Sequence, residues 1–223
     1  MLALGREHGD VNADGWDDIF VTAGMNLLFH YGINSLLLNN HGEKFVDSEF
    51  LLGIEPRAHP YTPWFVMDCN QKELGPNGKE VCQGETRKIT VTAPRGSRSS
   101  AMFDLDNDGD VDIVTKDFNS EPQVLISDLA EQKKINWLKI VLVGTKSNRN
   151  GLGATVRVRA GDQTYTKYND GQSSYLSQSV LPLYFGLGEA TKIDRVEVKW
   201  PSGREQSVAK GLSKNQILRI IEP

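Results

Sequence analysis

Two nine-residue segments of this chain place oxygen-bearing side chains at the same spacing. The first acidic loop, residues 10–18, reads DVNADGWDD, and the second acidic loop, residues 104–112, reads DLDNDGDVD. Both carry Asp or Asn at positions one, three, five and nine, and Gly at position six. The oxygens belong to Asp10, Asn12, Asp14 and Asp18 in one copy and to Asp104, Asp106, Asp108 and Asp112 in the other.

The spacing of these oxygens is typical of a site for a hard divalent cation. Ca²⁺ takes six to eight oxygen ligands, so a short loop must turn sharply while it aims alternate side chains inward. Gly15 and Gly109 supply the positive φ that such a turn can need. At position seven, Trp16 and Asp110 offer a backbone carbonyl whatever their side chains. We therefore expect two Ca²⁺ sites, although ligand type alone does not separate Ca²⁺ from Mg²⁺.

Strand-forming residues follow both loops, which distinguishes them from an EF-hand. An EF-hand loop closes with a bidentate Glu at position twelve and lies between helices. Here position twelve is Val21 in one copy and Thr115 in the other, within the runs IFV and IVT. Such β-branched and aromatic residues favour strands. We expect the ninth-position Asp to close each site, and each loop to lie between strands.

A simpler interpretation is that both loops are ordinary turns. Asp, Asn and Gly favour turns because they tolerate left-handed backbone and form local hydrogen bonds. The repetition of the pattern favours a cation site. So does the crowding of carboxylates, which repel one another unless a cation is present.

Each acidic loop resembles the cation-binding loop of an FG-GAP or VCBS repeat, the blade unit of integrin-α-like β-propellers. Residues 34–54, NSLLLNNHGEKFVDSEFLLGI, are similar to the end of such a blade. Residues 136–158, NWLKIVLVGTKSNRNGLGATVRV, resemble the ASPIC/UnbV domain, as do the later motifs YLSQSVLPLYFGLG and VEVKWPSG. This order resembles that of bacterial relatives of the cartilage acidic protein family. It implies a protein or carbohydrate partner on a loop face.

The resemblances and the residue patterns together predict an all-β protein in two parts. Residues 1–130 are expected to form a partial β-propeller of FG-GAP blades, with an insertion at about 56–98. Residues 131–223 alternate apolar and polar side chains between Gly and Asn turns, which is typical of an antiparallel β-sandwich. A propeller needs at least about four blades, so we expect upstream blades to be missing or supplied by a partner.

The cysteines of the chain, Cys69 and Cys82, bracket the segment GPNG at residues 75–78. That segment is a strong turn signal. Strands that run into and out of the turn would place the cysteines opposite each other, within reach of a disulfide. We expect this disulfide, as in extracellular or periplasmic proteins, and two free thiols are the alternative.

Charge and apolar content argue against several classes of protein. The chain has 223 residues, a net charge of −4 and a pI near 5.6, whereas a nucleic-acid-binding domain carries a basic stripe. No apolar run approaches the length of a membrane span, and the residues after Met1 form no signal peptide. Because the first acidic loop begins so close to Met1, we expect a fragment of an exported protein that is secreted, at the cell surface or periplasmic. A cytosolic protein is the alternative.

Catalytic motifs are absent from the sequence, so we predict a protein that is not an enzyme. It contains no GxSxG, HExxH, P-loop or GxGxxG after a strand. An enzyme would instead show a pocket that holds His59 with an unpaired carboxylate. The four histidines lack the spacing of metal ligands: His8, His30, His41 and His59.

Aromatic residues in the C-terminal part are candidates for a binding surface, because exposed rings stack on sugars or on a partner's side chains. Core packing is the alternative. Gln172 and Tyr175 lie just after a turn and are the candidates most expected to be exposed. The aromatic group is Tyr165, Tyr168, Tyr175, Tyr184 and Trp200.

These features predict a calcium-stabilised, extracytoplasmic binding or adhesion module for a protein or a carbohydrate. Two alternatives stay open. The resemblance to UnbV implies an accessory or enzymatic component of a biosynthetic pathway. Unpaired edge strands would instead suit a structural protein that self-associates.

Overall fold

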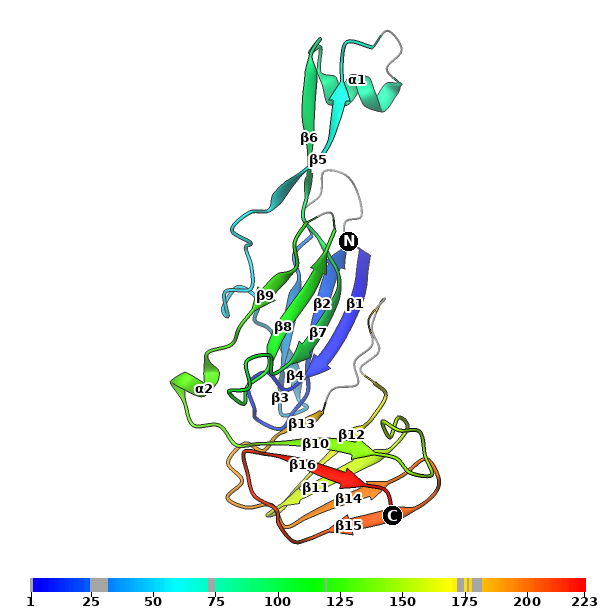
Figure 1. Cartoon of the computed structure of the whole chain (residues 1–223). Helices are drawn as coiled ribbons and strands as arrows, with labels where there is room; N and C mark the ends of the chain where they lie inside the picture. The colour runs from blue at the N-terminus through cyan, green and yellow to red at the C-terminus, as the bar shows by residue number, and fades with distance from the viewer. Residues whose placement is uncertain are drawn as a thin grey trace.

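The computed structural model describes residues 2–24, 32–71, 75–118, 120–171, 175, 177 and 182–223. Within these residues the protein is mostly β, as predicted, with five sheets and two short helices. Two small sheets and a projecting hairpin are followed by two sheets at the other end of the molecule (Figure 1). The described strands do not close into a propeller, so the propeller stays a prediction.

The first sheet is an antiparallel meander of four strands, and the first acidic loop joins its first two strands. Phe20 on β2 and Leu36 on β3 are fully buried on one face of the sheet. The strands are β1 (Leu2–Gly9), β2 (Asp18–Gly24), β3 (Ser35–Asn40) and β4 (Lys44–Asp47).

The second sheet repeats this arrangement with three strands, and the second acidic loop joins β7 to β8. Ile113 pairs with Leu125 as Ile19 pairs with Leu37 in the first sheet. A helix, α2, follows where the first sheet has its fourth strand. The elements are β7 (Ser97–Phe103), β8 (Asp112–Asp117), β9 (Gln123–Leu125) and α2 (Leu129–Gln132).

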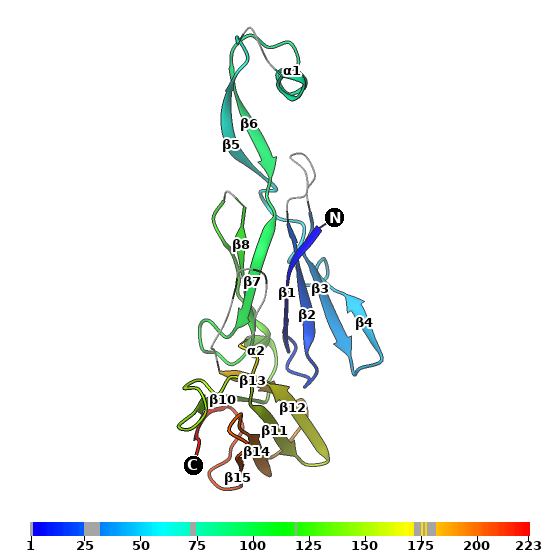
Figure 2. The ribbon, with the colours of Figure 1, turned by 90° about the vertical axis from the view of Figure 1, so that its right-hand side faces the viewer.

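An apolar core holds the two small sheets together. β7 contacts both β1 and β2, so the sheets lie side by side (Figure 2). Because apolar burial stabilises by roughly 25 cal/mol per Å², this shared core makes one body of the two repeats. Its buried members are Phe20, Leu36, Ile54, Met102, Val111 and Ile113.

A buried charge network reinforces this contact beside the apolar core. Arg57, in the segment after the first sheet, donates to Asp117 at 2.5 Å and to Ser97 at 2.6 Å, both on the second sheet. Arg57 also lies 3.5 Å from Glu55, which accepts the backbone N–H of Asn34. Buried charges of this kind are tolerated because each has a partner.

The insertion forms a hairpin arm that projects away from the small sheets (Figure 1). It consists of β5 (Tyr61–Asp68), α1 (Pro76–Cys82) and β6 (Lys88–Pro94). The predicted disulfide between Cys69 and Cys82 is present, with 5.7 Å between the Cα atoms. The expected turn at residues 75–78 is wrong: Pro76 begins α1, because the fixed φ of proline suits the first turn of a helix.

The C-terminal part is a sandwich of two sheets. One sheet has the order β13-β10-β16 and the other β12-β11-β14-β15. Alternate residues point inward, so Leu138, Val156, Val198 and Trp200 meet in one core. The strands are β10 (Trp137–Val143), β11 (Thr155–Ala160), β12 (Gln163–Tyr168), β13 (Leu183–Gly186), β14 (Arg195–Lys199), β15 (Glu205–Val208) and β16 (Gln216–Ile221).

One pairing corrects the prediction of an antiparallel sandwich. β10 and β16 run parallel, with Leu138 opposite Gln216 and Val143 opposite Ile221. These are the first and last strands of the sandwich. The whole second sheet lies between them in sequence, and such a long connection permits parallel pairing where a short hairpin does not.

Glu222 closes the sandwich just beyond β16. Its carboxylate accepts the backbone N–H groups of Thr145, Lys146 and Ser147 at 2.7–2.8 Å and the hydroxyls of Ser147 and Ser202. Burial opposes ionisation, but these hydrogen bonds outweigh it and hold the pKa of Glu222 well below its usual range.

We expect Glu222→Gln to lower the melting temperature at pH 7, because an amide cannot replace a carboxylate that accepts five hydrogen bonds. Since the folded pKa is depressed, this stabilisation is complete above the unfolded pKa of about 4.3 and is lost as the pH falls towards the folded value. Thermal melts from pH 7 to 3 should show the difference from the wild type shrinking below about pH 4. Glu205→Gln, at an exposed site on β15, is the control. Identical melts of wild type and Glu222→Gln at pH 7 would contradict this role.

Candidate metal centre

The two acidic loops have the same backbone conformation. Position four is left-handed in both, at Ala13 (φ 57°) and Asn107 (φ 66°). Position six has a positive φ in both, 97° at Gly15 and 108° at Gly109. This agreement shows that the sequence repeat is also a structural repeat.

Hydrogen bonds from the backbone to the side chains recur in the two loops. The first-position Asp accepts the sixth-position N–H, at 2.8 Å for Asp10 and 2.9 Å for Asp104. The ninth-position Asp accepts the second-position N–H in both loops. It also accepts an N–H from a later segment, from Asn39 on β3 in the first copy and from Ser127 after β9 in the second. Asp18 and Asp112 therefore close their loops by hydrogen bonding.

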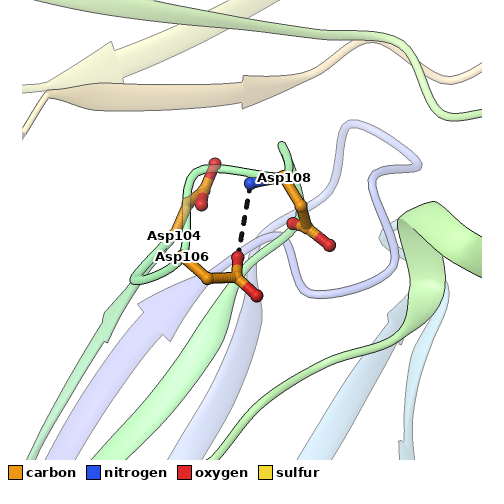
Figure 3. A group of neighbouring side chains, drawn as sticks. All are labelled: Asp104, Asp106 and Asp108. Carbon is orange, nitrogen blue, oxygen red and sulfur yellow. Dashed lines mark hydrogen bonds between the residues drawn. The ribbon is translucent and has the colours of Figure 1, made fainter.

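The second acidic loop gathers its carboxylates (Figure 3). Asp104, Asp106 and Asp108 each offer an oxygen within 4.8 Å of the others. In the described part of the chain, no other three residues of the types His, Cys, Asp and Glu come together in this way. In the first loop, position three is Asn12, whose amide instead donates to Asp14 at 3.0 Å.

Burial makes the charges in both loops costly. It raises the pKa of Asp10 to about 7 and that of Asp18 to about 6, with neighbouring carboxylates adding to the shift. Burial also raises the pKa values of Asp110 and Asp112. Each group would ionise more readily beside a cation, so the electrostatics of both loops favour bound positive charge.

One buried oxygen at the second loop lacks a partner. The side chain of Asp104 is 1% exposed, and its Oδ1 atom has no hydrogen-bond partner. A buried carboxylate oxygen without a partner is unfavourable. A cation would satisfy it, so the residues fit Ca²⁺. Asp104, Asp106, Asp108 and the carbonyl of Asp110 are the ligands that the loop would supply, with Asp112 fixing its closure.

The sandwich covers both loops with equivalent pairs of side chains. Tyr165 packs against Gly15, and Trp137 packs against Gly109. A Cβ atom added to these glycines would lie 2.3 Å from the Tyr165 ring and 2.1 Å from the Trp137 ring. A lysine on the same strand as each aromatic residue contacts the same loop: Lys167 contacts Asp17, and Lys139 contacts Asp104. Neither lysine was predicted as a site residue. The signal was present for Lys139, since it interrupts the otherwise apolar run WLKIVLV.

The predicted binding residues have mixed positions. Tyr184 donates its hydroxyl to the carbonyl of Gly109 at 3.0 Å, and Trp200 lies in the sandwich core. Tyr168 and Tyr175 are exposed. Gln172 and His30 lie outside the described residues. His59 is exposed.

A cleft of about 540 Å³ opens between the first acidic loop and the sandwich. Trp16 lines it, with its indole edge-on to His41 at 6.2 Å between ring centroids. Gln163, Tyr165 and Glu189 line the sandwich side. The cleft thus combines aromatic and hydrogen-bonding side chains from both parts of the chain.

The fold and the site together define a modular β protein in which two acidic loops of the small sheets contact a β-sandwich. The family model described as "ASPIC and UnbV" matches residues 144–223, so this part of the sandwich is similar to an ASPIC/UnbV domain. The match begins after β10, which nevertheless lies in the middle of its sheet. The FG-GAP resemblance of the loops stays a prediction.

The chain is also similar to "Cartilage acidic protein 1" of Xenopus tropicalis, at 32% identity over 127 residues. The aligned stretch covers 55% of this chain and 19% of that protein, so the chain spans about a fifth of the relative's length. Within the described residues, neither helix has the length and apolar character of a membrane-spanning segment.

We expect the double substitution Asp104→Ala/Asp108→Ala to lower the calcium content by about one ion per chain, because it removes two ligands of one site. Atomic emission spectroscopy after dialysis measures this content. The control Asp47→Ala/Glu121→Ala removes the same charge at exposed positions outside the loops and should leave the content unchanged. Full calcium content in the loop variant would eliminate the second acidic loop as a site.

Proposed function

We propose that this chain is a calcium-stabilised, non-catalytic binding or adhesion module that works outside the cytoplasm. The observation that carries the proposal is the second acidic loop, where three carboxylates converge and a buried Asp104 oxygen lacks a partner beside the sandwich. Calcium there would be structural, because it would fix a loop that joins strands of one sheet and contacts the next domain.

The shared backbone conformation of the two loops supports their assignment as cation loops of FG-GAP-like blades. Ca²⁺ suits them better than Mg²⁺, because Mg²⁺ keeps several waters and demands octahedral geometry. The disulfide and the similarity to a cartilage acidic protein fit an extracellular location.

The cleft beside the first acidic loop is where we place the partner, a protein or a carbohydrate. Trp16 is 41% exposed there. An exposed indole offers a large apolar face, and Gln163 and Glu189 offer hydrogen bonds around it. Because Trp16 occupies position seven of the loop, calcium binding would order the residue that contacts the partner.

Thermal melts in EDTA, followed by addition of calcium or magnesium, test the cation. At free calcium about 100-fold above its Kd, we expect a stabilisation of about 2.7 kcal/mol per site. That corresponds to a rise in melting temperature of roughly 5–10 °C for a chain of this size. Magnesium should raise it less. An unchanged melting temperature with both ions would return the acidic loops to ordinary turns.

Screening on immobilised glycans and extracellular proteins, in calcium and in EDTA, tests the binding role. We expect retention in calcium that Trp16→Ala abolishes, because the substitution removes the aromatic surface of the cleft. Tyr168→Ala, at another exposed aromatic position, is the control. Retention that survives Trp16→Ala would move the partner site away from the cleft.

Self-association is a second candidate function, favoured by the free edge of the first sheet. β4 is an edge strand, and its residues Phe45 and Val46 are exposed, as are Phe50 and Leu51 just after it. Unpaired edges template pairing with other chains. Light scattering that shows a monomer at the working concentration would remove this candidate.

A further inference from the structure

Lys139 is the charged group that faces the second acidic loop from the sandwich. It lies on β10, is 6% exposed, and places its ammonium on the Oδ2 atom of Asp104. The indole of Trp137 lies 4.8 Å from the same ammonium. The contact therefore joins two domains through one buried ion pair.

The two oxygens of Asp104 have different environments. Oδ2 accepts from Lys139 and from the N–H of Gly109, whereas Oδ1 is buried without a partner. An ion held by the convergent oxygens of Asp104, Asp106 and Asp108 would reach this carboxylate while the ammonium stays on its other oxygen. Two cations would then share one carboxylate and repel each other in a poorly solvated site.

Lys167 provides the natural comparison at the first acidic loop. It contacts Asp17, which occupies position eight, where neither loop has a predicted ligand. Asp17 also has His8 at 3.3 Å and is 33% exposed, so its charge is compensated and partly solvated. Both lysines hold the sandwich against an acidic loop. Of the two, only Lys139 contacts the Asp at position one of its loop.

We propose that Lys139 is a built-in competitor of calcium at the second acidic loop. This inference rests on the proposed cation function. Without calcium, the ammonium compensates Asp104 and holds the sandwich on the loop. With calcium, the divalent ion weakens that contact, and by reciprocity the contact lowers the affinity of the loop for calcium. Lys139 thereby sets the calcium affinity and couples it to the docking of the two domains.

Terbium luminescence on the whole chain tests the proposal, with Tb³⁺ displaced by Ca²⁺. Trp137 packs on Gly109, so its indole would sensitise Tb³⁺ bound in the second loop. Trp16→Phe in every variant removes the indole of the first loop. We expect Lys139→Met to bind calcium at least about tenfold more tightly than its parent. Lys139→Arg, which keeps the charge, and Lys167→Met should stay within about twofold. Equal affinities for Lys139→Met and Lys167→Met, or weaker binding by Lys139→Met, would overturn the proposal.

Melting temperatures separate competition from a merely structural role. We expect Lys139→Met to melt lower than its parent in EDTA and to gain more from calcium. A purely structural lysine would lower both melts equally and leave the affinity unchanged. Lys139→Gln, which keeps a neutral donor on a side chain one bond shorter, replaces Lys139→Met if that variant does not fold. A parent protein that binds neither Tb³⁺ nor Ca²⁺ would reject the cation function itself, and the competition with it.

Discussion

The need to compensate carboxylates buried between the small sheets and the sandwich governs this structure. Asp10 and Asp104 lie where the small sheets meet the sandwich, and little water reaches them. Charge in such a place requires nearby positive groups or hydrogen-bond donors. The loop backbone supplies N–H groups from within, and the sandwich supplies Lys139 and Lys167 from outside. Docking of the sandwich on the small sheets and folding of the loops are thus parts of one electrostatic arrangement.

Local patterns in the sequence were sufficient for much of this picture. Alternating side chains predicted the sandwich strands, and the repeated spacing of Asp and Asn predicted two equivalent loops. The pairing of Cys69 with Cys82 was also predicted, although Cys82 belongs to a helix. Such features depend on residues close together in the chain, and this closeness is why they can be recognised without a structure.

Features that depend on distant residues were not predicted. The parallel pairing of β10 with β16 joins strands that no turn connects, so no turn residue records it. Lys139 stands 35 positions from Asp104, and its contact with that residue depends on how the sandwich packs on the small sheets. The asymmetry between the loops, in which Asn12 replaces an Asp, was visible in the sequence. The gathering of three carboxylates in the second loop, by contrast, depends on side-chain positions that the sequence does not give.

The pairing of the first and last strands of the sandwich also orders events during synthesis. β10 leaves the ribosome long before β16. Because β10 is the middle strand of its sheet, the edge that pairs with β16 stays unpaired until the end of the sandwich emerges. Because domains fold as units during translation, Lys139 reaches its final place late. Both acidic loops are by then complete, so small sheets that fold first would do so with their loop carboxylates uncovered. Ions in the surrounding solution are the counter-charges available at that stage.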